Sequence, residues 1–281
     1  MLNRKFTLIT GASEGFGKAL AIECASRKIN LVLVALPGPE LNNLADFIKG
    51  NFGVAVYTIE KDLTNEDNCM NVYNEVLQLQ LPVNTLINNA GLGSTMLFSE
   101  GSISFYQKQI KLNIQATTML THLFMDMLKK NGPSYILNVG SLSSYFYLPK
   151  KQVYGASKSF IYCFSKCLRR ELNESEVSVS VICPGSMNTN IPITQLLKTS
   201  GWLSRTAVMN PEDVAPIAID GLLNRKEVIV PGKMNNLFLL MNKILPSAIK
   251  KMMIRRQMNS IKSVTAAEQK AQTIPLTEVN N

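Results

Sequence analysis

Short apolar runs alternate with longer segments of helical periodicity along most of the chain. Most of these runs are apolar on consecutive positions, which is typical of a parallel sheet that helices cover on both faces. We predict strands at residues 6–10, 30–35, 55–60, 85–88, 135–140, 178–183 and 227–230, and helices at residues 15–27, 39–49, 65–79, 102–130, 154–173 and 211–223. Their alternation predicts right-handed crossovers and an α/β fold, a doubly wound parallel sheet of about seven strands.

Two regions interrupt this alternation. Residues 184–209 contain no clear strand, and a loop of this length inside a compact domain is usually functional, so we predict a lid over a binding site. After Gly232 the pattern changes again, and apolar residues recur at helical spacing among basic ones. We therefore predict a catalytic domain at 1–232, a basic amphipathic helical extension at 233–262 and a flexible tail at 263–281.

The positive charge of the chain is concentrated in this extension and tail. The net charge is +9, and the segment from Arg225 to Asn281 holds ten basic and three acidic residues. Met and Leu rather than aromatic residues separate the charges, and no base-reading motif is present, which argues against a nucleic-acid partner. Two interpretations stay open: helices that pack on their own domain or a second subunit, or peripheral contact of residues 234–258 with an anionic membrane.

Cysteine and histidine usage excludes several kinds of site. The five cysteines show no disulfide framework and no C-x-x-C spacing, and His122 is the single histidine. A zinc site or a histidine-based triad is therefore not expected, and we predict no metal. The N-terminal apolar run is too short for a signal peptide, and no stretch reaches the length of a membrane span. We expect a cytoplasmic protein, with peripheral membrane contact as the variant noted above.

The first predicted strand leads directly into a glycine-rich turn. The turn reads T-G-A-S-E-G-F-G, from Thr10 to Gly17, and a predicted helix follows at once. Glycine at these positions lets the backbone turn sharply and approach a pyrophosphate, while the helix N-terminus offers free N–H groups to phosphates. A tight turn without a ligand would also explain the glycines alone.

A second group of residues has the chemistry of proton transfer. Tyr154 and Lys158 are four residues apart, so they lie on one face of the predicted helix. A tyrosine with its ordinary pKa of about 10 is a poor base at neutral pH, but a nearby ammonium stabilises the phenolate. Ser141 ends a predicted strand, where it can donate a hydrogen bond to a substrate oxygen. Ser143 and Ser144 are expected in the following loop, bonded to backbone.

Together these motifs resemble those of the short-chain dehydrogenase/reductase family, from about Lys5 to Gly232. The family's other elements are matched by N-N-A-G at 88–91, by Asp62-Leu63 after the third strand and by Pro184-Gly185 with Thr189. The resemblance implies a Rossmann-type sheet, hydride transfer between a nicotinamide cofactor and a carbonyl or alcohol, and Asn113, Ser141, Tyr154 and Lys158 as catalytic residues. It also implies a cofactor site formed by Gly11, Ser13, Gly15, Phe16, Gly17, Asp62, Leu63, Asn89, Ala90, Gly91, Tyr154, Lys158, Pro184, Gly185 and Thr189.

The residues that usually select between NAD and NADP are absent. A carboxylate at the end of the second strand would bind the ribose 2′-hydroxyl of NAD, and an arginine just after it would bind the NADP phosphate. These places are held by Ala35 and Leu36. Glu14 precedes Gly15, where a carboxylate would repel a 2′-phosphate. NAD or NADP is therefore expected, and Glu14 favours NAD.

The substrate and the assembly are less closely defined by the sequence. The expected pocket is formed by residues 92–96, 146–149 and 186–205, whose mostly apolar or neutral side chains fit a small lipophilic carbonyl compound, although they could equally just pack the lid. The resemblance implies a homodimer or homotetramer through helices 102–130 and 154–173. Two other functions are less well supported. A non-enzymatic Rossmann scaffold would have little need for the proton-transfer group. A sugar-nucleotide epimerase usually has a larger C-terminal domain.

Overall fold

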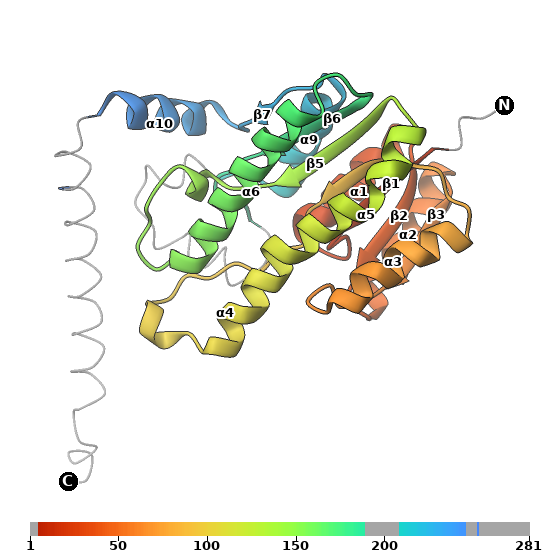
Figure 1. Ribbon diagram of the computed structural model, residues 1–281, viewed down its shortest axis with the longest axis horizontal. Coiled ribbons are helices and arrows are strands. Elements are labelled where there is room, and N and C mark those ends of the chain that lie inside the picture. The colour runs from red at the N-terminus through yellow and green to blue at the C-terminus, as the bar shows by residue number, and fades with distance from the viewer. Residues whose placement is uncertain (1–4, 189–207, 246–251, 253–281) are drawn as a thin grey trace, which may run out of the picture.

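The structure is a computed structural model of the chain, and it describes residues 5–188, 208–245 and 252. Its seven strands form one parallel sheet in the order β3-β2-β1-β4-β5-β6-β7 (Figure 1). The strands are β1 (Phe6–Thr10), β2 (Asn30–Ala35), β3 (Val56–Glu60), β4 (Val83–Asn88), β5 (Ser134–Val139), β6 (Val177–Ile182) and β7 (Val228–Ile229). The predicted doubly wound Rossmann-type sheet is confirmed, and its order reverses between β1 and β4.

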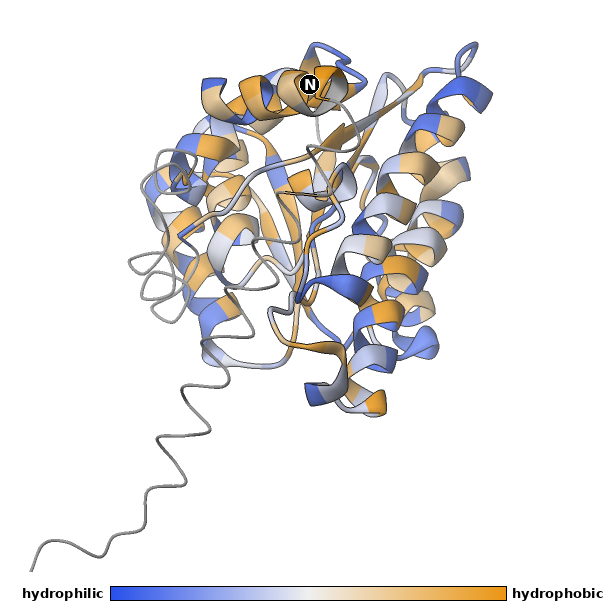
Figure 2. Cartoon of the chain, turned by 90° about the vertical axis from the view of Figure 1, so that its left-hand side faces the viewer, coloured by the Kyte–Doolittle hydropathy of each residue, from blue (hydrophilic) through white to orange (hydrophobic). Residues whose placement is uncertain are grey.

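Helices cover both faces of this sheet. The α-helices of the described residues are α1 (Gly15–Ser26), α2 (Pro39–Phe52), α3 (Glu66–Gln78), α4 (Ile103–Ile110), α5 (Thr117–Lys130), α6 (Gln152–Glu171), α9 (Pro211–Leu223) and α10 (Lys233–Ile244), the last of which lies beyond β7. One buried cluster joins α1, α2 and α9 to the sheet, and a second joins α3 and α5 to the other face. In Figure 2 the hydrophobic residues accordingly gather on the strands and on the helix surfaces that turn toward them.

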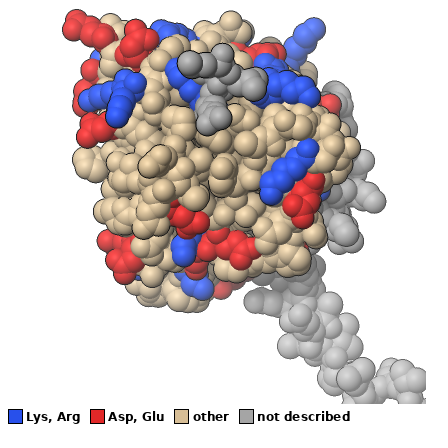
Figure 3. All heavy atoms as spheres, turned by 90° about the vertical axis from the view of Figure 1, so that its right-hand side faces the viewer, with Lys and Arg blue, Asp and Glu red and all other residues tan. Residues whose placement is uncertain are grey.

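The two buried faces explain why the strands are apolar on consecutive positions. Leu8 and Ile9 are adjacent in β1 and fully buried, yet they belong to different clusters on opposite faces of the sheet. At the outer edge, β3 has only two buried residues, and its other three are partly or fully exposed. The surface over this end of the molecule carries charges of both signs around a largely uncharged centre (Figure 3).

The predicted helix at 102–130 is the main departure from the sequence pattern. It is interrupted by a turn of π-helix at Lys111–Ala116, between α4 and α5. A π turn adds a residue without breaking the helix, and such turns are frequent at functional sites. This one contains Asn113, whose side chain is buried.

The parallel arrangement brings the carboxyl ends of β1, β4, β5 and β6 to one edge of the sheet, where the loops of open α/β sheets form their ligand crevice. Met187 and Met209 form an isolated bridge at the base of the predicted lid. Most of that lid, including Thr189, and most of the predicted extension and tail lie outside the described residues.

Candidate active site

The glycine turn between β1 and α1 is shaped by close backbone packing. Gly11 and Gly15 have φ of 63° and 52°, in the left-handed region that favours glycine. A Cβ at Gly17 would overlap the Gly11 carbonyl oxygen. No side chain caps α1, so its first N–H groups are left for a ligand. These features fit the pyrophosphate of a dinucleotide.

The end of β4 holds this turn in place. The Asn89 side-chain amide donates to the carbonyl oxygens of Thr10 (2.9 Å) and Gly11 (3.0 Å). In return, the Thr10 hydroxyl accepts the backbone N–H groups of Asn89 and Ala90, both at 3.0 Å. Two sequence motifs about eighty residues apart therefore form one rigid unit, with the reversal of strand order between them.

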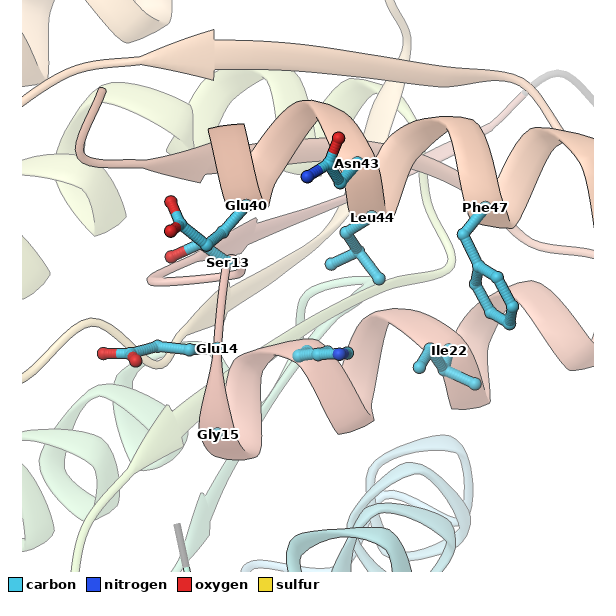
Figure 4. A pocket seen from close by; sticks show the side chains of 9 residues that line it. Ser13, Glu14, Gly15, Ile22, Glu40, Asn43, Leu44 and Phe47 are labelled. Atoms are coloured by element: carbon cyan, nitrogen blue, oxygen red, sulfur yellow. The ribbon is translucent and has the colours of Figure 1, made fainter. Parts of the chain in front are cut away.

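A surface hollow of about 630 Å³ lies beside the turn. Ser13, Glu14 and Lys18 form one wall and α2 forms the other, with Glu40 near its first residue (Figure 4). A Cβ on Gly38 would lie 2.7 Å from Glu40 Oε2, so the Glu40 carboxylate lies back over the loop that follows β2. Two carboxylates thus lie beside this hollow, and the second of them was missed by sequence reasoning.

The predicted adenine-contacting pair, Asp62-Leu63, follows β3. Leu63 is buried in the core, and Asp62 Oδ1 accepts the backbone N–H of Thr64 at 2.9 Å. Asp62 therefore stabilises its own turn.

Lys158 is buried next to Tyr154 on α6. Its Nζ donates to the Val139 carbonyl oxygen at 2.7 Å and lies 5.9 Å from the centroid of the Tyr154 ring. Burial lowers the pKa of Lys158 to about 8, because an ammonium is poorly solvated there. The ammonium thus faces the carboxyl end of β5 as well as the tyrosine.

Two serine hydroxyls lie near the Tyr154 phenol. Burial raises the pKa of this phenol, while the hydroxyls of Ser141 and Ser143 lower it, because hydroxyl donors favour the phenolate. Ser143 Oγ also donates to Ser141 Oγ at 2.7 Å. Our expectation that the Ser143 side chain bonds to backbone was therefore wrong, since a short 3₁₀ turn at Leu142–Ser144 directs it to the Ser141 hydroxyl. Ser144 does bond to backbone, at Lys158 O (2.9 Å).

Asn113 connects the tyrosine helix to the segment after N-N-A-G. Its Oδ1 accepts Leu92 N at 2.7 Å, and its Nδ2 donates to Leu92 O at 3.1 Å and to Ser157 Oγ at 2.9 Å. A Cβ on Gly91 would lie 3.3 Å from Asn113 Oδ1 and 3.4 Å from Lys158 Nζ. The structure thus brings Asn113, Ser141, Tyr154 and Lys158 to one place, beside the glycine turn.

The Pro184-Gly185 element is backed by the start of α10. A Cβ on Gly185 would lie 2.9 Å from the amide of Asn235, which is buried and donates to Pro231 O at 2.7 Å. Sequence reasoning missed Asn235 because only the tertiary fold brings it to this element.

Residues 5–188, 208–245 and 252 hold no cluster of three or more His, Cys, Asp or Glu side chains able to bind a metal. Over the same residues, no helix is long and apolar enough to cross a membrane.

A dinucleotide turn and a Tyr–Lys–Ser group at the edge of a parallel sheet define a nicotinamide-dependent oxidoreductase, and comparison with known proteins gives the family. Residues 5–197 match the model of the short chain dehydrogenase family. The chain belongs to the short-chain dehydrogenase/reductase family and is an NAD(P)-dependent oxidoreductase.

Two relatives show the range of this similarity. Human (Homo sapiens) 17-beta-hydroxysteroid dehydrogenase type 3 is 30% identical over 70% of the chain, a match that spans 63% of that protein. Sulfoacetaldehyde reductase 2 of Chromohalobacter salexigens is 32% identical over 75% of the chain and 85% of its own length.

Solved structures with the same fold contain either cofactor. A short-chain dehydrogenase from Sphingobium yanoikuyae in complex with NADPH is 24% identical, with a TM-score of 0.73 and coverage of 99% of both chains. One from Burkholderia phymatum in complex with NAD is 22% identical, with a TM-score of 0.74 and coverage of 86% of this chain and 94% of that one.

Proposed function

We propose that the protein interconverts a carbonyl and an alcohol on a small, largely apolar substrate, with Tyr154 as the acid and base. The observation that carries this proposal is the convergence of Tyr154, Lys158 and Ser141 beside the glycine turn. Gly11, Ser13, Gly15, Phe16, Gly17, Asn89, Ala90, Gly91 and the Pro184-Gly185 element would hold the nicotinamide cofactor, which supplies or accepts the hydride. Their close backbone packing and the uncapped α1 fit its pyrophosphate.

In the reductive direction the substrate oxygen gains negative charge and needs a proton. Burial raises the pKa of Tyr154, so the phenol keeps its proton at neutral pH and can donate it to that oxygen. Ser141, near the same phenol, donates a hydrogen bond to the oxygen as charge develops. The phenolate that remains is stabilised by the Lys158 ammonium, and in the oxidative direction it removes the proton from the alcohol.

The test is the substitution Tyr154→Phe, which removes the hydroxyl and keeps the ring. We expect turnover to be abolished and cofactor affinity to be nearly unchanged, as measured by NADH and NADPH oxidation with a panel of ketones, aldehydes and quinones and by cofactor titration. Tyr57→Phe, on the partly exposed edge strand β3, is the matched control and should keep wild-type turnover. Substantial turnover by Tyr154→Phe would overturn the assignment.

For the cofactor we propose NAD rather than NADP. Glu14 and Glu40 both line the hollow beside the glycine turn, where the 2′-substituent of the adenosine ribose is expected (Figure 4). Carboxylates there accept hydrogen bonds from a ribose hydroxyl and repel a 2′-phosphate. The ratio of kcat/KM for NADH and NADPH on one aldehyde tests this, and a strong preference for NADPH would refute it.

We further propose a cytoplasmic homodimer or homotetramer that pairs through α4, α5 and α6. Apolar side chains exposed on α4 and α6, among them Ile103, Ile110 and Phe160, support such pairing. Five free cysteines suit a reducing compartment.

On α10 the apolar stripe is also exposed, at Leu237, Leu240, Met241 and Ile244, which supports peripheral contact of this helix with a membrane or cover by a partner subunit.

A further inference from the structure

Lys151 lies beside Tyr154 in the proposed active site, and the proposed reaction gives it no role. It precedes the first residue of α6, three positions before Tyr154, and its side chain is half-buried. Lys151 Nζ lies 5.2 Å from the centroid of the Tyr154 ring and donates to Thr95 Oγ1 at 3.2 Å. The ammonium therefore sits between the tyrosine and the segment 92–96 that follows N-N-A-G.

This ammonium has no counter-ion in the described part of the chain. The four ion pairs found there do not include Lys151, and its hydrogen-bond partner is a neutral hydroxyl. Burial lowers the pKa of Lys151, which reflects the cost of keeping the charge without an anion nearby. An anion brought by a ligand would offset this cost, because a partly buried ammonium gains from a charged partner.

The sequence around the pocket offers few anions. Residues 141–170, which include Ser141, Lys151 and Tyr154, contain no Asp or Glu. In residues 92–110 the single acidic residue is Glu100, and its carboxylate accepts the backbone N–H of Leu97 at 2.7 Å. The substrate side of the molecule is thus short of negative charge, whereas the cofactor side has Glu14 and Glu40.

The backbone around Lys151 is fixed by contacts with the opposite wall. Lys150 has φ of 65°, a left-handed conformation that is uncommon outside glycine, and its carbonyl oxygen accepts Met96 N at 3.0 Å. On the other side, Gln109 Nε2 donates to Leu92 O (2.9 Å) and Ser94 Oγ (3.3 Å). These bonds join the two segments, so the ammonium is held near the phenol.

We propose that Lys151 binds an anionic group of the substrate, which is therefore an oxo acid, or the corresponding hydroxy acid, with one carboxylate or an equivalent oxyanion. This inference rests on the proposed function, because it places the carbonyl at Tyr154. The anion and the carbonyl then belong to one small molecule and are separated by a few bonds. A charged group on this ammonium gains a charge-assisted hydrogen bond that a neutral group cannot make.

The test compares oxo acids with their methyl esters. The probes are 2-oxobutanoate, 3-oxobutanoate and 4-oxopentanoate, whose carboxylates lie at increasing distance from the carbonyl. Binding is measured calorimetrically to the full chain saturated with NAD⁺, which cannot donate a hydride, so the measurement does not depend on turnover. We expect the wild-type chain to bind at least one acid roughly ten- to a hundredfold more tightly than its ester.

The variants separate a role in substrate binding from a role in the fold. Lys151→Met should bring the ratio of acid to ester affinity close to one, with Lys151→Gln as a second neutral variant should the first fail to fold. Lys151→Arg should keep the preference, and Lys150→Met is the matched control because it removes an adjacent charge and should behave as wild type. Equal binding of every acid and its ester by the wild type, or an unchanged preference in Lys151→Met, would overturn the proposal.

The same measurements distinguish this proposal from the proposed function. Tyr154→Phe should keep the preference for the acid, because the ammonium is untouched. Turnover by Tyr154→Phe would refute the role of Tyr154 but would not affect the binding result for Lys151. Loss of the acid preference in Lys151→Met would support the anion site even if the enzyme reduces none of these probes.

Discussion

Lys158 shows how one buried side chain couples the site to the stability of the fold. Its pKa of about 8 lies below the ordinary value of 10.5, since burial disfavours the ammonium. Below pH 8 the folded chain keeps a buried charge at a cost in free energy. Between pH 8 and 10.5 the unfolded chain binds more protons than the folded one, so this cost disappears as the pH rises.

We therefore predict that Lys158→Met changes the pH dependence of stability as well as activity. The free energy of unfolding of wild type relative to the variant should rise by about 3 kcal/mol between pH 7 and 11, because a shift of one pKa unit corresponds to about 1.4 kcal/mol. Chemical denaturation of the cofactor-free chain at a series of pH values measures it. Lys108→Met, exposed on α4, is the control; a constant difference for Lys158→Met would contradict the prediction.

At the scale of the elements, a chain of buried amides joins two strands to two helices. Asn88 Nδ2 on β4 donates to Asn138 Oδ1 on β5 (2.9 Å) and to Thr121 Oγ1 on α5 (3.0 Å). Asn138 Nδ2 donates in turn to Ser165 Oγ on α6 at 2.9 Å. The chain lies directly below the residues that lead into the site, so it fixes the spacing of the sheet and α6.

We predict that Asn138→Leu lowers the free energy of unfolding by about 1–3 kcal/mol, because Asn88 and Ser165 lose a buried partner. The double variant Asn88→Leu/Asn138→Leu should lose less than the sum of the two single variants, since it leaves fewer unpaired amides. Asn51→Ala, whose exposed amide bonds to Phe47 O, should change stability by less than about 0.5 kcal/mol. Denaturant titration measures all four, and a neutral Asn138→Leu would show that the chain contributes no net stability.

The elements were largely predictable because each strand is buried on both faces or ends in a turn with its own residue pattern. All seven strands were expected within a few residues of their positions, and the glycine turn and Tyr154–Lys158 spacing located the site. The π turn at Lys111–Ala116 could not be predicted, since Asn113 gains its partners only when Leu92 and Ser157 are packed beside it. Asn235, Glu40 and Lys151 were missed for the same reason, because the fold brings them to their sites, whereas the Ser143 side chain was misplaced because its local 3₁₀ turn was not predicted.

At the scale of the whole molecule, charge and exposed apolar surface are unevenly distributed. The segment from Arg225 onward holds ten basic and three acidic residues, and α10 begins within it. In Figure 1, α10 lies beyond β7, at the end of the sheet opposite β3. Its first turn packs against Gly185 through Asn235, while Leu240 and Ile244 are exposed. Removing the chain after Gly232 would therefore also remove the contact between Asn235 and Gly185. Point substitutions on the exposed face of α10 avoid this and test membrane contact more directly.

We predict that the full chain sediments with vesicles containing phosphatidylserine and that Leu240→Asp/Ile244→Asp reduces this, because the substitutions place charge on the apolar stripe. Cofactor affinity should be unchanged. Leu77→Asp/Leu79→Asp, which alters two exposed leucines at the end of α3, is the matched control. Equal sedimentation of all three proteins would contradict the prediction and would favour an α10 that is covered by a partner subunit. In that case the α10 variant should form a smaller oligomer than the wild type in solution.

The position of β1 has a consequence for the growing chain. Synthesis makes β1 first, yet it lies in the interior of the sheet, paired with β2 on one side and with β4 on the other. By residue 60 the strands β1, β2 and β3 can pair, but the second edge of β1 stays open until Val83–Asn88 has left the ribosome. An open, largely apolar strand edge invites pairing with other chains. We therefore expect nascent chains of about this length to need protection that the finished protein does not.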